Sequence, residues 1–347
     1  MKTITVTLMQ HTPMIHFQYD QYGATLRASE VKPKLDRYLL DWLGEDGGYE
    51  AGCEESKKNG WLVGKGDHLA LDYKMRIVAE QPVNVQLTPV QVQTRNGTKW
   101  KADFPMLLSN IMGGGQKNKE DLRFFTMHKK VTMTLYFNNE ELFNALNIDT
   151  EIPKFFATTN FGQRSNKGFG SFTVTSIGDK KYKNTEFANK DYFMNFSNGS
   201  ASEYPNKIYT ITKQKSLFKI IDAFWKEVKG KITKYDHSIN RNKIGSVESY
   251  IKYMPDLEVK KLGVDRLPTP ILFKPISYKG KDRMYFSVYI MLDNDMLQRL
   301  YHMDRLPDKF GDKKIDNMRY IKNFVENKLT DNGEWDCNNV TVKFYGR

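Results

Sequence analysis

The stretch from Phe161 to Thr175 constrains the fold of this chain more than any other part of its 347 residues. Three glycines, two cations and several small polar residues come first, and the alternating sequence Phe-Thr-Val-Thr follows directly. Glycine allows a positive φ and lets a second backbone approach closely, while alternating apolar and polar residues are typical of a strand. We therefore predict a flexible basic loop that leads into a strand near Phe172.

The charges of this loop suit a polyanion such as RNA. Arg164 and Lys167 supply cations for a phosphate group. The alternative is a sharp turn whose cations lie in water, and a short glycine-rich motif does not distinguish the two by itself. The loop residues that we expect to contact RNA are Gly162, Arg164, Ser165, Lys167, Gly168, Phe169 and Gly170.

The composition narrows the class of protein. Its 53 Lys and Arg residues against 41 Asp and Glu residues give a formal net charge of +12, so RNA, DNA or an acidic membrane is the expected partner. A hydrophobic content of 39% supports globular cores, and the length predicts two domains. No run approaches the apolar length of a membrane span, so we expect a cytoplasmic protein. The charge is scattered over loops and is not gathered on one amphipathic helix, which argues against a membrane partner, and no recognition helix of the helix-turn-helix kind favours duplex DNA.

The sequence holds no motif for a cofactor or a metal. No Walker loop, serine triad or dinucleotide fingerprint occurs, and the glycine loop precedes a strand, whereas phosphate-binding loops of nucleotide enzymes precede a helix. Cys53 and Cys337 have no second thiol near them in the sequence, which excludes a zinc ribbon and a disulfide framework. We expect no cofactor and no metal site.

Hydrophobic periodicity predicts the elements of the first half. We expect strands at 1–9, 69–78, 83–92 and 124–137 and from 172 onward. A helix should begin at a Ser29 cap and end at Gly44, and a shorter helix, capped by Asn138, should cover 140–146. Residues 45–66 and 110–123 are predicted to be exposed, the second segment basic and mobile. This order of strands and helices is that of a ferredoxin-like βαββαβ unit.

A similar order is predicted in the second half. Strands at 207–212, 270–276, 283–292 and 340–345, with a hairpin turn at Gly280, alternate with helices at 216–228, 246–253 and 316–329. The predicted fold class is α+β, with two ferredoxin-like, RRM-like domains that carry basic loop insertions. The domains span 1–178 and 206–347, and 179–205 is an exposed basic linker or insertion between them.

A second group of cations surrounds the start of the helix at Ser29. Arg27 lies just before this helix, and Lys32, Lys34 and Arg37 lie in or next to its first turns. Backbone N–H groups at a helix N-terminus favour an anion. Cations that repel one another are unusual there unless an anion binds, so these four residues are also candidates for RNA binding.

Three motifs together resemble a known family. They are Thr12-Pro13 after the first strand, Ala-Thr-Leu-Arg-Ala-Ser-Glu-Val-Lys-Pro-Lys-Leu at 24–35 leading into a helix, and Gly-Gln-Arg-Ser-Asn-Lys-Gly-Phe-Gly-Ser at 162–171. The chain resembles the RAMP proteins of CRISPR systems, and within that superfamily the first subunit of the Cmr effector complex of type III-B systems. Lys32-Pro33-Lys34 departs from the small residues that this family usually has before the helix.

The resemblance implies two ferredoxin-like halves and a non-catalytic role. Such a protein is one subunit of an antiviral ribonucleoprotein, contacts guide RNA and target RNA near the guide 3′ end, and assembles with other RAMP subunits. Aromatic rings beside basic loops can stack on RNA bases. Tyr19, Tyr22 and Phe169 are placed in this way, and packing against the sheet is the alternative for each of them.

A RAMP-family endoribonuclease is the alternative function. RAMP relatives that process guide RNA use a histidine as general acid or base, for which His11, His16 and His128 are the candidates. The target-cleaving RAMP subunit places an aspartate in the loop after the first strand, and Asp20 occupies a comparable stretch. The simpler interpretations are structural histidines in strands and an aspartate in a turn.

Overall fold

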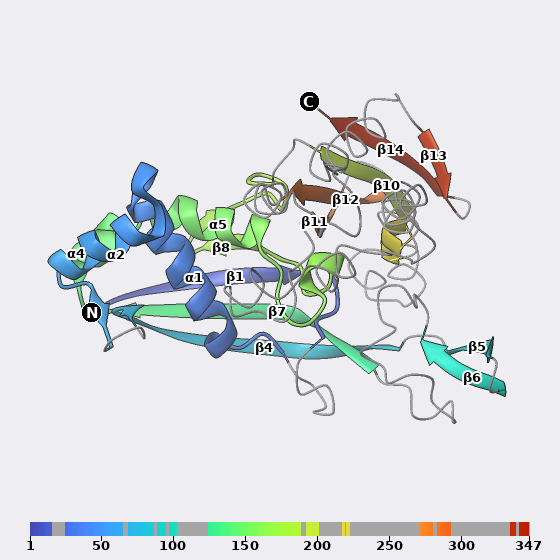
Figure 1. The fold of residues 1–347 in the computed structure, drawn as a ribbon, viewed down its shortest axis with the longest axis horizontal. Coiled ribbons are helices and arrows are strands. Elements are labelled where there is room, and N and C mark those ends of the chain that lie inside the picture. The colour runs from blue at the N-terminus through green and yellow to red at the C-terminus, as the bar shows by residue number, and fades with distance from the viewer. Residues whose placement is uncertain are drawn as a thin grey trace, which may run out of the picture.

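The computed structural model describes residues 1–15, 25–64, 69–86, 89–94, 97–102, 124–188, 192–200, 217–218, 220–222, 271–279, 283–292, 334–337 and 340–346. Its strands form two five-stranded sheets and two two-stranded sheets. Every strand pairing in these segments is antiparallel. The architecture is therefore a mixed α/β fold built on antiparallel sheets (Figure 1).

The first sheet has the strand order β4-β7-β1-β8-β9. Its strands are β1 (Lys2–Gln10), β4 (Tyr73–Gln86), β7 (Phe124–Phe137), β8 (Phe172–Ile177) and β9 (Lys180–Lys181). The strands predicted at 124–137 and after the glycine loop are confirmed. β4 is longer than predicted and includes Pro82, which is tolerated because β4 lies at the edge of the sheet.

Short hairpins flank this sheet. β2 (Leu62–Val63) pairs with β3 (Ala70–Leu71), and β5 (Pro89–Thr94) pairs with β6 (Gly97–Ala102). The strand predicted over 83–92 is thus divided between the end of β4 and β5. The basic segment 110–123 lies outside the described residues.

Helices cover one face of the first sheet. They are α1 (Ala28–Leu43), α2 (Gly48–Lys58), α4 (Glu140–Ala145) and α5 (Ile148–Thr158). Val6 and Leu8 of β1 and Met133 of β7 are buried in one core with Leu39 of α1 and Phe156 of α5. Figure 1 shows α1 and α5 lying over the sheet on the same side.

The prediction of an exposed loop over 45–66 is wrong, because η1 (Glu45–Gly47) and α2 occupy most of it. Glycine-rich sequence has a low helix propensity, but here the glycines allow α2 to lie directly against α1. A Cβ at Gly52 would lie 1.7 Å from Leu40 O, and one at Gly44 would lie 1.8 Å from Gly48 O. Tertiary packing therefore overrides local propensity.

The helix ends also differ from the predictions. α1 has Arg27 at its N-cap with no side-chain cap, so Ser29 is not the cap. Asn139, and not Asn138, caps α4, since its Oδ1 accepts a hydrogen bond from Leu142 N at 3.0 Å.

The helix α5, which contains Pro153, was not predicted. A proline inside a helix leaves the carbonyl four residues earlier without its helical donor. Here that carbonyl is Asp149 O, and Tyr182 OH donates to it at 2.9 Å. A tertiary hydrogen bond therefore compensates for the bond that Pro153 removes.

The second sheet has the strand order β11-β12-β10-β14-β13. Its strands are β10 (Tyr192–Ser200), β11 (Ile271–Lys279), β12 (Arg283–Leu292), β13 (Glu334–Cys337) and β14 (Val340–Gly346). The predicted hairpin of β11 and β12 and the last strand are confirmed, while β13 was not predicted. Residues 217–218 and 220–222 are helical, as expected for the helix at 216–228.

The prediction that 179–205 is an exposed linker is wrong for two of its parts. Residues 180–181 form β9, and 192–200 form β10, which pairs with β12 and β14 in the middle of the second sheet. The Asn and Gly residues of β10 are uncommon in strands, so its local sequence does not indicate one. The strand forms because it pairs with β12 and β14, which lie far away in the sequence. The strand predicted at 207–212 and the helices at 246–253 and 316–329 lie outside the described residues, and the domain boundaries stay a prediction.

The described helices include none that is both long enough and apolar enough to cross a membrane.

Candidate nucleic-acid interface

The glycine loop, which spans residues 160–171, is closed at its base. Asn160 and Ser171 form an isolated antiparallel bridge, and Phe161 N donates to Gly170 O at 2.9 Å. Within the loop, η3 (Ser165–Lys167) makes a single tight turn. The loop therefore leads into β8 as predicted.

The glycines of the loop are needed both for positive φ values and for close approach of a second backbone. Gly162, Gly168 and Gly170 have φ values of 81°, 91° and 65°. A Cβ at Gly170 would lie 1.9 Å from Phe161 O, and one at Gly162 would lie 2.4 Å from Ile15 O. No side chain fits at these distances, so the loop backbone approaches its neighbours as only glycine permits.

The segment after β1 holds the loop by hydrogen bonds. His11 N donates to Ser171 O and Gly170 N donates to Pro13 O, both at 2.8 Å. Thr12 Oγ1 donates to Gly168 O at 2.7 Å and accepts from Ser171 N at 2.9 Å. The loop is therefore a tightly bonded segment, and the prediction of a flexible loop is not supported by its contacts.

A lysine of the second sheet joins the two ends of the loop. Lys274 on β11 is fully buried, and its Nζ donates to Thr159 O at 2.8 Å and to Phe172 O at 2.9 Å. Burial lowers the pKa of Lys274 well below its usual value. Because Thr159 and Phe172 flank the loop on either side, this single amine fixes its base.

Two further bonds connect the loop to β11. Asn160 Nδ2 donates to Phe273 O at 2.8 Å, and Ser171 Oγ donates to Pro275 O at 2.6 Å. Together with Lys274, they form a polar seam between the first sheet and β11, and η3 of the loop lies against that strand.

His11 completes the polar seam. Ser277 N donates to its Nδ1 at 3.1 Å, so the neutral ring carries its proton on Nε2, which lies 2.7 Å from Thr173 Oγ1. Burial, and secondly the charge of Lys274, lowers the pKa of His11 well below its usual value. The ring is fully buried and bonded at both nitrogens, which is the environment of a structural histidine.

Two of the predicted RNA-binding residues of the loop face the interior. Lys167 is only 5% exposed, and Phe169 is fully buried with its ring stacked on Phe218 at a centroid distance of 4.2 Å. Stacking of Phe169 on a base is therefore excluded in this structure, and packing, the alternative stated from the sequence, is what occurs. Gly168 is also buried, against Pro275.

Lys32 on α1 is likewise turned inward. Its Nζ donates to Asp36 Oδ2 at 2.7 Å and to Leu71 O at 2.9 Å, and lies 4.2 Å from the centroid of the Tyr73 ring. Burial is the main cause of a raised pKa at Asp36, and the charge of Lys32 opposes that shift. The ammonium of Lys32 thus compensates a buried carboxyl group.

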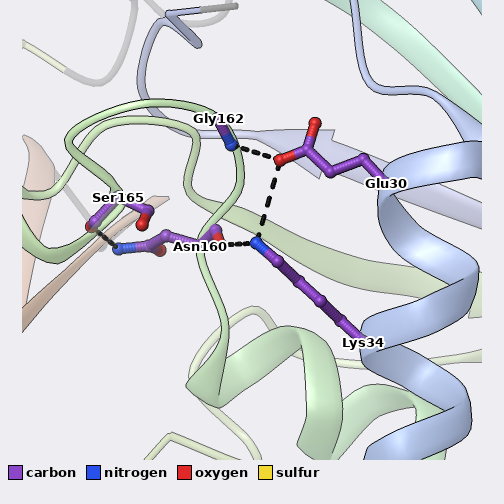
Figure 2. A network of polar contacts seen from close by, with 5 residues as sticks. All are labelled: Glu30, Lys34, Asn160, Gly162 and Ser165. Carbon is purple, nitrogen blue, oxygen red and sulfur yellow. Dashed lines mark hydrogen bonds and ion pairs between the residues drawn. The ribbon is translucent and has the colours of Figure 1, made fainter. Parts of the chain in front are cut away.

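Lys34 links α1 to the loop (Figure 2). Its Nζ donates to Asn160 O at 3.3 Å and lies 3.8 Å from Glu30 Oε1, which also accepts from Gly162 N. Asn160 Nδ2 in turn donates to Ser165 O at 2.7 Å. Acidic residues of α1 therefore lie beside Lys32 and Lys34, so these two cations do not need an external anion to offset their charge. RNA binding by the cations around the start of α1 stays a prediction.

The remaining predicted cations are accessible. Arg37 is exposed, with its guanidinium 5.1 Å from the ring centroid of Tyr49 on α2. Arg27, at the start of α1, and Arg164, in the loop, are partly exposed, and Lys34 is 42% exposed. Lys34 and Glu30 join α1 to the loop, Arg27 precedes α1, and Arg164 lies within the loop, and we call this region the junction of α1 with the loop.

The structure describes two of the four nuclease candidates, His11 and His128. His128 is buried, and burial lowers its pKa. Its backbone N donates to Gln10 Oε1 at 2.9 Å. His16, Asp20, Tyr19 and Tyr22 lie outside the described residues. Within the described segments, no group of three or more His, Cys, Asp or Glu side chains could hold a metal ion.

Sequence reasoning missed the partners of the loop in the second half. Lys274 and Ser277 contribute to the polar seam, yet neither belongs to a motif. The one available signal is that Lys274 interrupts the otherwise apolar sequence Ile-Leu-Phe-Lys-Pro-Ile at 271–276. A lone cation in an apolar strand indicates a buried, hydrogen-bonded amine.

Comparison with known protein families identifies the family of this chain. The family model described as the Cmr1 N-terminal domain matches residues 1–232, which is more than half of the chain. The chain belongs to the Cmr1 family. The resemblance to the first subunit of the Cmr effector complex, based on the motifs at 12–13, 24–35 and 162–171, is thereby confirmed. No curated protein matches the chain.

Solved structures of the same system are similar over nearly the whole chain. The crystal structure of apo Cmr1 from Pyrococcus furiosus is 12% identical, with a TM-score of 0.44 and coverage of 100% of this chain and 99% of that one. A cryo-EM structure of the type III-B Cmr-beta complex bound to cognate target RNA is 9% identical, with a TM-score of 0.41 and coverage of 92% and 99%. A second Cmr-beta structure, with target RNA, AMPPnP and single-stranded DNA, is 10% identical, with a TM-score of 0.41 and coverage of 93% and 98%.

The close approach at Gly170 predicts a large effect of a single methyl group. We expect Gly170→Ala to lower the free energy of unfolding by well over 2 kcal/mol, since left-handed strain of about 1–2 kcal/mol adds to the clash with Phe161 O. Gly178→Ala is the control, because Gly178 has a φ of 54° with nothing within 4 Å of its Cβ position. Equal losses in urea unfolding would contradict the close approach.

The buried His11 predicts a pH dependence of stability. Because its pKa is lowered in the folded state, below about pH 6.5 the unfolded chain binds a proton that the folded chain does not. The free energy of unfolding therefore decreases as the pH is lowered. Between about pH 7.5 and 5.5, the wild type should lose about 1.4 kcal/mol relative to His11→Gln. Denaturant unfolding at both pH values measures this difference, and a constant difference would show that His11 titrates normally.

Proposed function

We propose that the chain is a non-catalytic RNA-binding subunit of a type III-B CRISPR effector ribonucleoprotein. In this role it contacts guide RNA, target RNA or both near the guide 3′ end, beside other RAMP subunits of the complex, in antiviral defence. The observation that carries the proposal is the match of the Cmr1 N-terminal domain to residues 1–232. The net charge of +12 supports a polyanionic partner.

We infer further that both halves are ferredoxin-like. The first sheet contains the order β4-β7-β1-β8, and the second contains the order β11-β12-β10-β14. If these four strands of each half are numbered along the chain, both orders read 2-3-1-4, which is the strand order of a ferredoxin-like sheet. α1, α2 and α5 occupy the connections that this topology requires in the first half. The helical residues 217–218 and 220–222 follow β10 in the second half, in the position of the first connecting helix.

The proposed RNA contact is the junction of α1 with the glycine loop. Arg27, Lys34 and Arg164 are the accessible cations there, and Arg37 lies one turn further along α1. Lys32 and Lys167 are left out because their side chains are turned inward. The glycine loop contributes because its hydrogen bonds fix the segment that carries Arg164, and because α1 contacts that loop through Lys34 and Glu30, so that the phosphate-binding charges are preorganised.

The absence of catalysis is part of this proposal. A general acid or base must reach the proton that it transfers, and His11 is fully buried with both ring nitrogens engaged. The buried ring of His128 has a lowered pKa and a partner 3.4 Å away in Thr25. These environments favour structural roles for both histidines over the endoribonuclease alternative.

The junction cations predict the salt dependence of RNA binding. In the full chain, Arg27→Gln with Arg164→Gln should weaken binding of single-stranded RNA and reduce the magnitude of the slope of log K against log salt by about 1.4, since each lost phosphate contact contributes about 0.7. Lys57→Gln with Lys58→Gln is the control, because these exposed lysines end α2. An unchanged slope in the first variant would remove the junction from the interface.

The assembled effector tests both the partners and the nuclease alternative. A tagged chain purified from its native host should bring down repeat-derived guide RNA and other RAMP-like subunits, and the Asp20→Ala version should assemble and cleave target RNA at the wild-type rate. Loss of cleavage with assembly preserved would assign catalysis to Asp20. Purification of the chain alone, without RNA, would refute the effector role.

A further inference from the structure

The described helices α1, α2, α4 and α5 leave one face of the first sheet uncovered. Along β1 and β7 buried residues alternate with exposed or half-buried ones. Along β4 the buried Tyr73 and the half-buried Met75, Ile77 and Ala79 alternate with exposed residues, and these inward residues belong to or pack against the core that includes α1 and α5. The other set therefore points to the opposite side, because successive side chains of a strand alternate between the two faces. On β4 this set includes Lys74 and Arg76, both exposed.

Strand register places these cations beside hydroxyl groups. Lys74 pairs with Tyr136 of β7, which pairs with Thr3 of β1, and Arg76 pairs with Thr134, which pairs with Thr5. Directly opposite residues share a face, with Cα atoms about 4.5–5.5 Å apart. The six residues Lys74, Arg76, Thr134, Tyr136, Thr3 and Thr5 form what we name the open sheet face.

The charge of this face is not neutralised by the described segments. Neither Lys74 nor Arg76 forms an ion pair with a residue in them, whereas Lys130 on the same face lies 3.2 Å from Glu80. Lys74 and Arg76 are two residues apart on one strand, so their Cα atoms are about 6.8 Å apart. They form a short cationic row along the exposed edge of the sheet, next to a half-buried tyrosine.

We propose that the open sheet face is a second RNA-binding surface, which takes the backbone of a single strand on Lys74 and Arg76. Tyr136 and the threonine hydroxyls add hydrogen bonds to phosphate and sugar oxygens. The proposal rests on the RNA-binding function given above, and it assigns that function a surface on the side of the sheet opposite α1.

The chemistry of the face favours RNA over a neighbouring protein subunit. Phosphate and sugar oxygens accept hydrogen bonds from Arg, Lys, Thr and Tyr side chains without sequence selection. The centre of a stable protein interface is apolar and depleted in charge. Among the described residues, Val78, at 39% exposure, is the only exposed large hydrophobic side chain that shares this face of β4.

The test compares salt titrations of RNA binding for the full-length wild-type chain and three full-length double variants. Lys74→Gln with Arg76→Gln should reduce the magnitude of the salt slope for single-stranded RNA by about 1.4, whereas Lys57→Gln with Lys58→Gln should leave it unchanged. Thermal unfolding of each variant checks the fold. An unchanged slope in the first variant, with a reduced slope in the Arg27 and Arg164 variant, would overturn the open sheet face and leave the proposed function intact.

Cross-linking of RNA to the wild-type chain tests the open sheet face even if the Lys74 and Arg76 variant does not fold. Ultraviolet irradiation of the complex with 4-thiouridine RNA should label the peptide that contains Tyr136, and labelling confined to other peptides would overturn the proposal. If the Lys74 and Arg76 variant keeps the wild-type slope but no longer co-purifies with other effector subunits, the face binds protein and the proposal fails. No RNA binding by the wild-type chain would refute the proposed function itself.

Discussion

The arrangement of this protein depends on one buried amine, that of Lys274. An amine without water must find hydrogen-bond acceptors, and here Thr159 O and Phe172 O supply them from the two sides of the glycine loop. Since Lys274 belongs to β11 and both carbonyls to the first half, the same contact closes the loop and connects the sheets. Asn160 and Ser171 add bonds to neighbouring carbonyls of β11.

This contact indicates a structural role for the glycine loop. A basic, glycine-rich loop is easily interpreted as a flexible clamp for phosphate, but in this structure its lysine and phenylalanine are directed into the interior. The loop acts as a joint between α1, the segment after β1, and β11. Positive charge remains accessible at Arg27, Lys34 and Arg164, and a rigid joint keeps those charges in place before RNA arrives, which reduces the entropy lost on binding.

Local patterns predicted the long strands of the first sheet, the hairpin and last strand of the second, the helix α1, and part of the candidate site. Alternation located β7 and β8, and the need for glycine at Gly162 and Gly170 was correctly inferred from the loop. The errors share a cause: α2 forms because Gly52 lets it lie on α1, and α5 tolerates Pro153 because Tyr182 bonds the freed carbonyl. Neither contact can be read from the segment that it stabilises.

The sequence by itself determined the class of the protein, its basic charge, its family motifs and the need for glycine in its central loop, because these follow from composition and from residues adjacent in the chain. Only the tertiary structure decided which cations are accessible. Lys32 and Lys34 are two positions apart on α1, yet one ammonium compensates the buried Asp36 and the other reaches the loop. Burial and partner distance, which settle the cost of a charge, are properties of the folded chain.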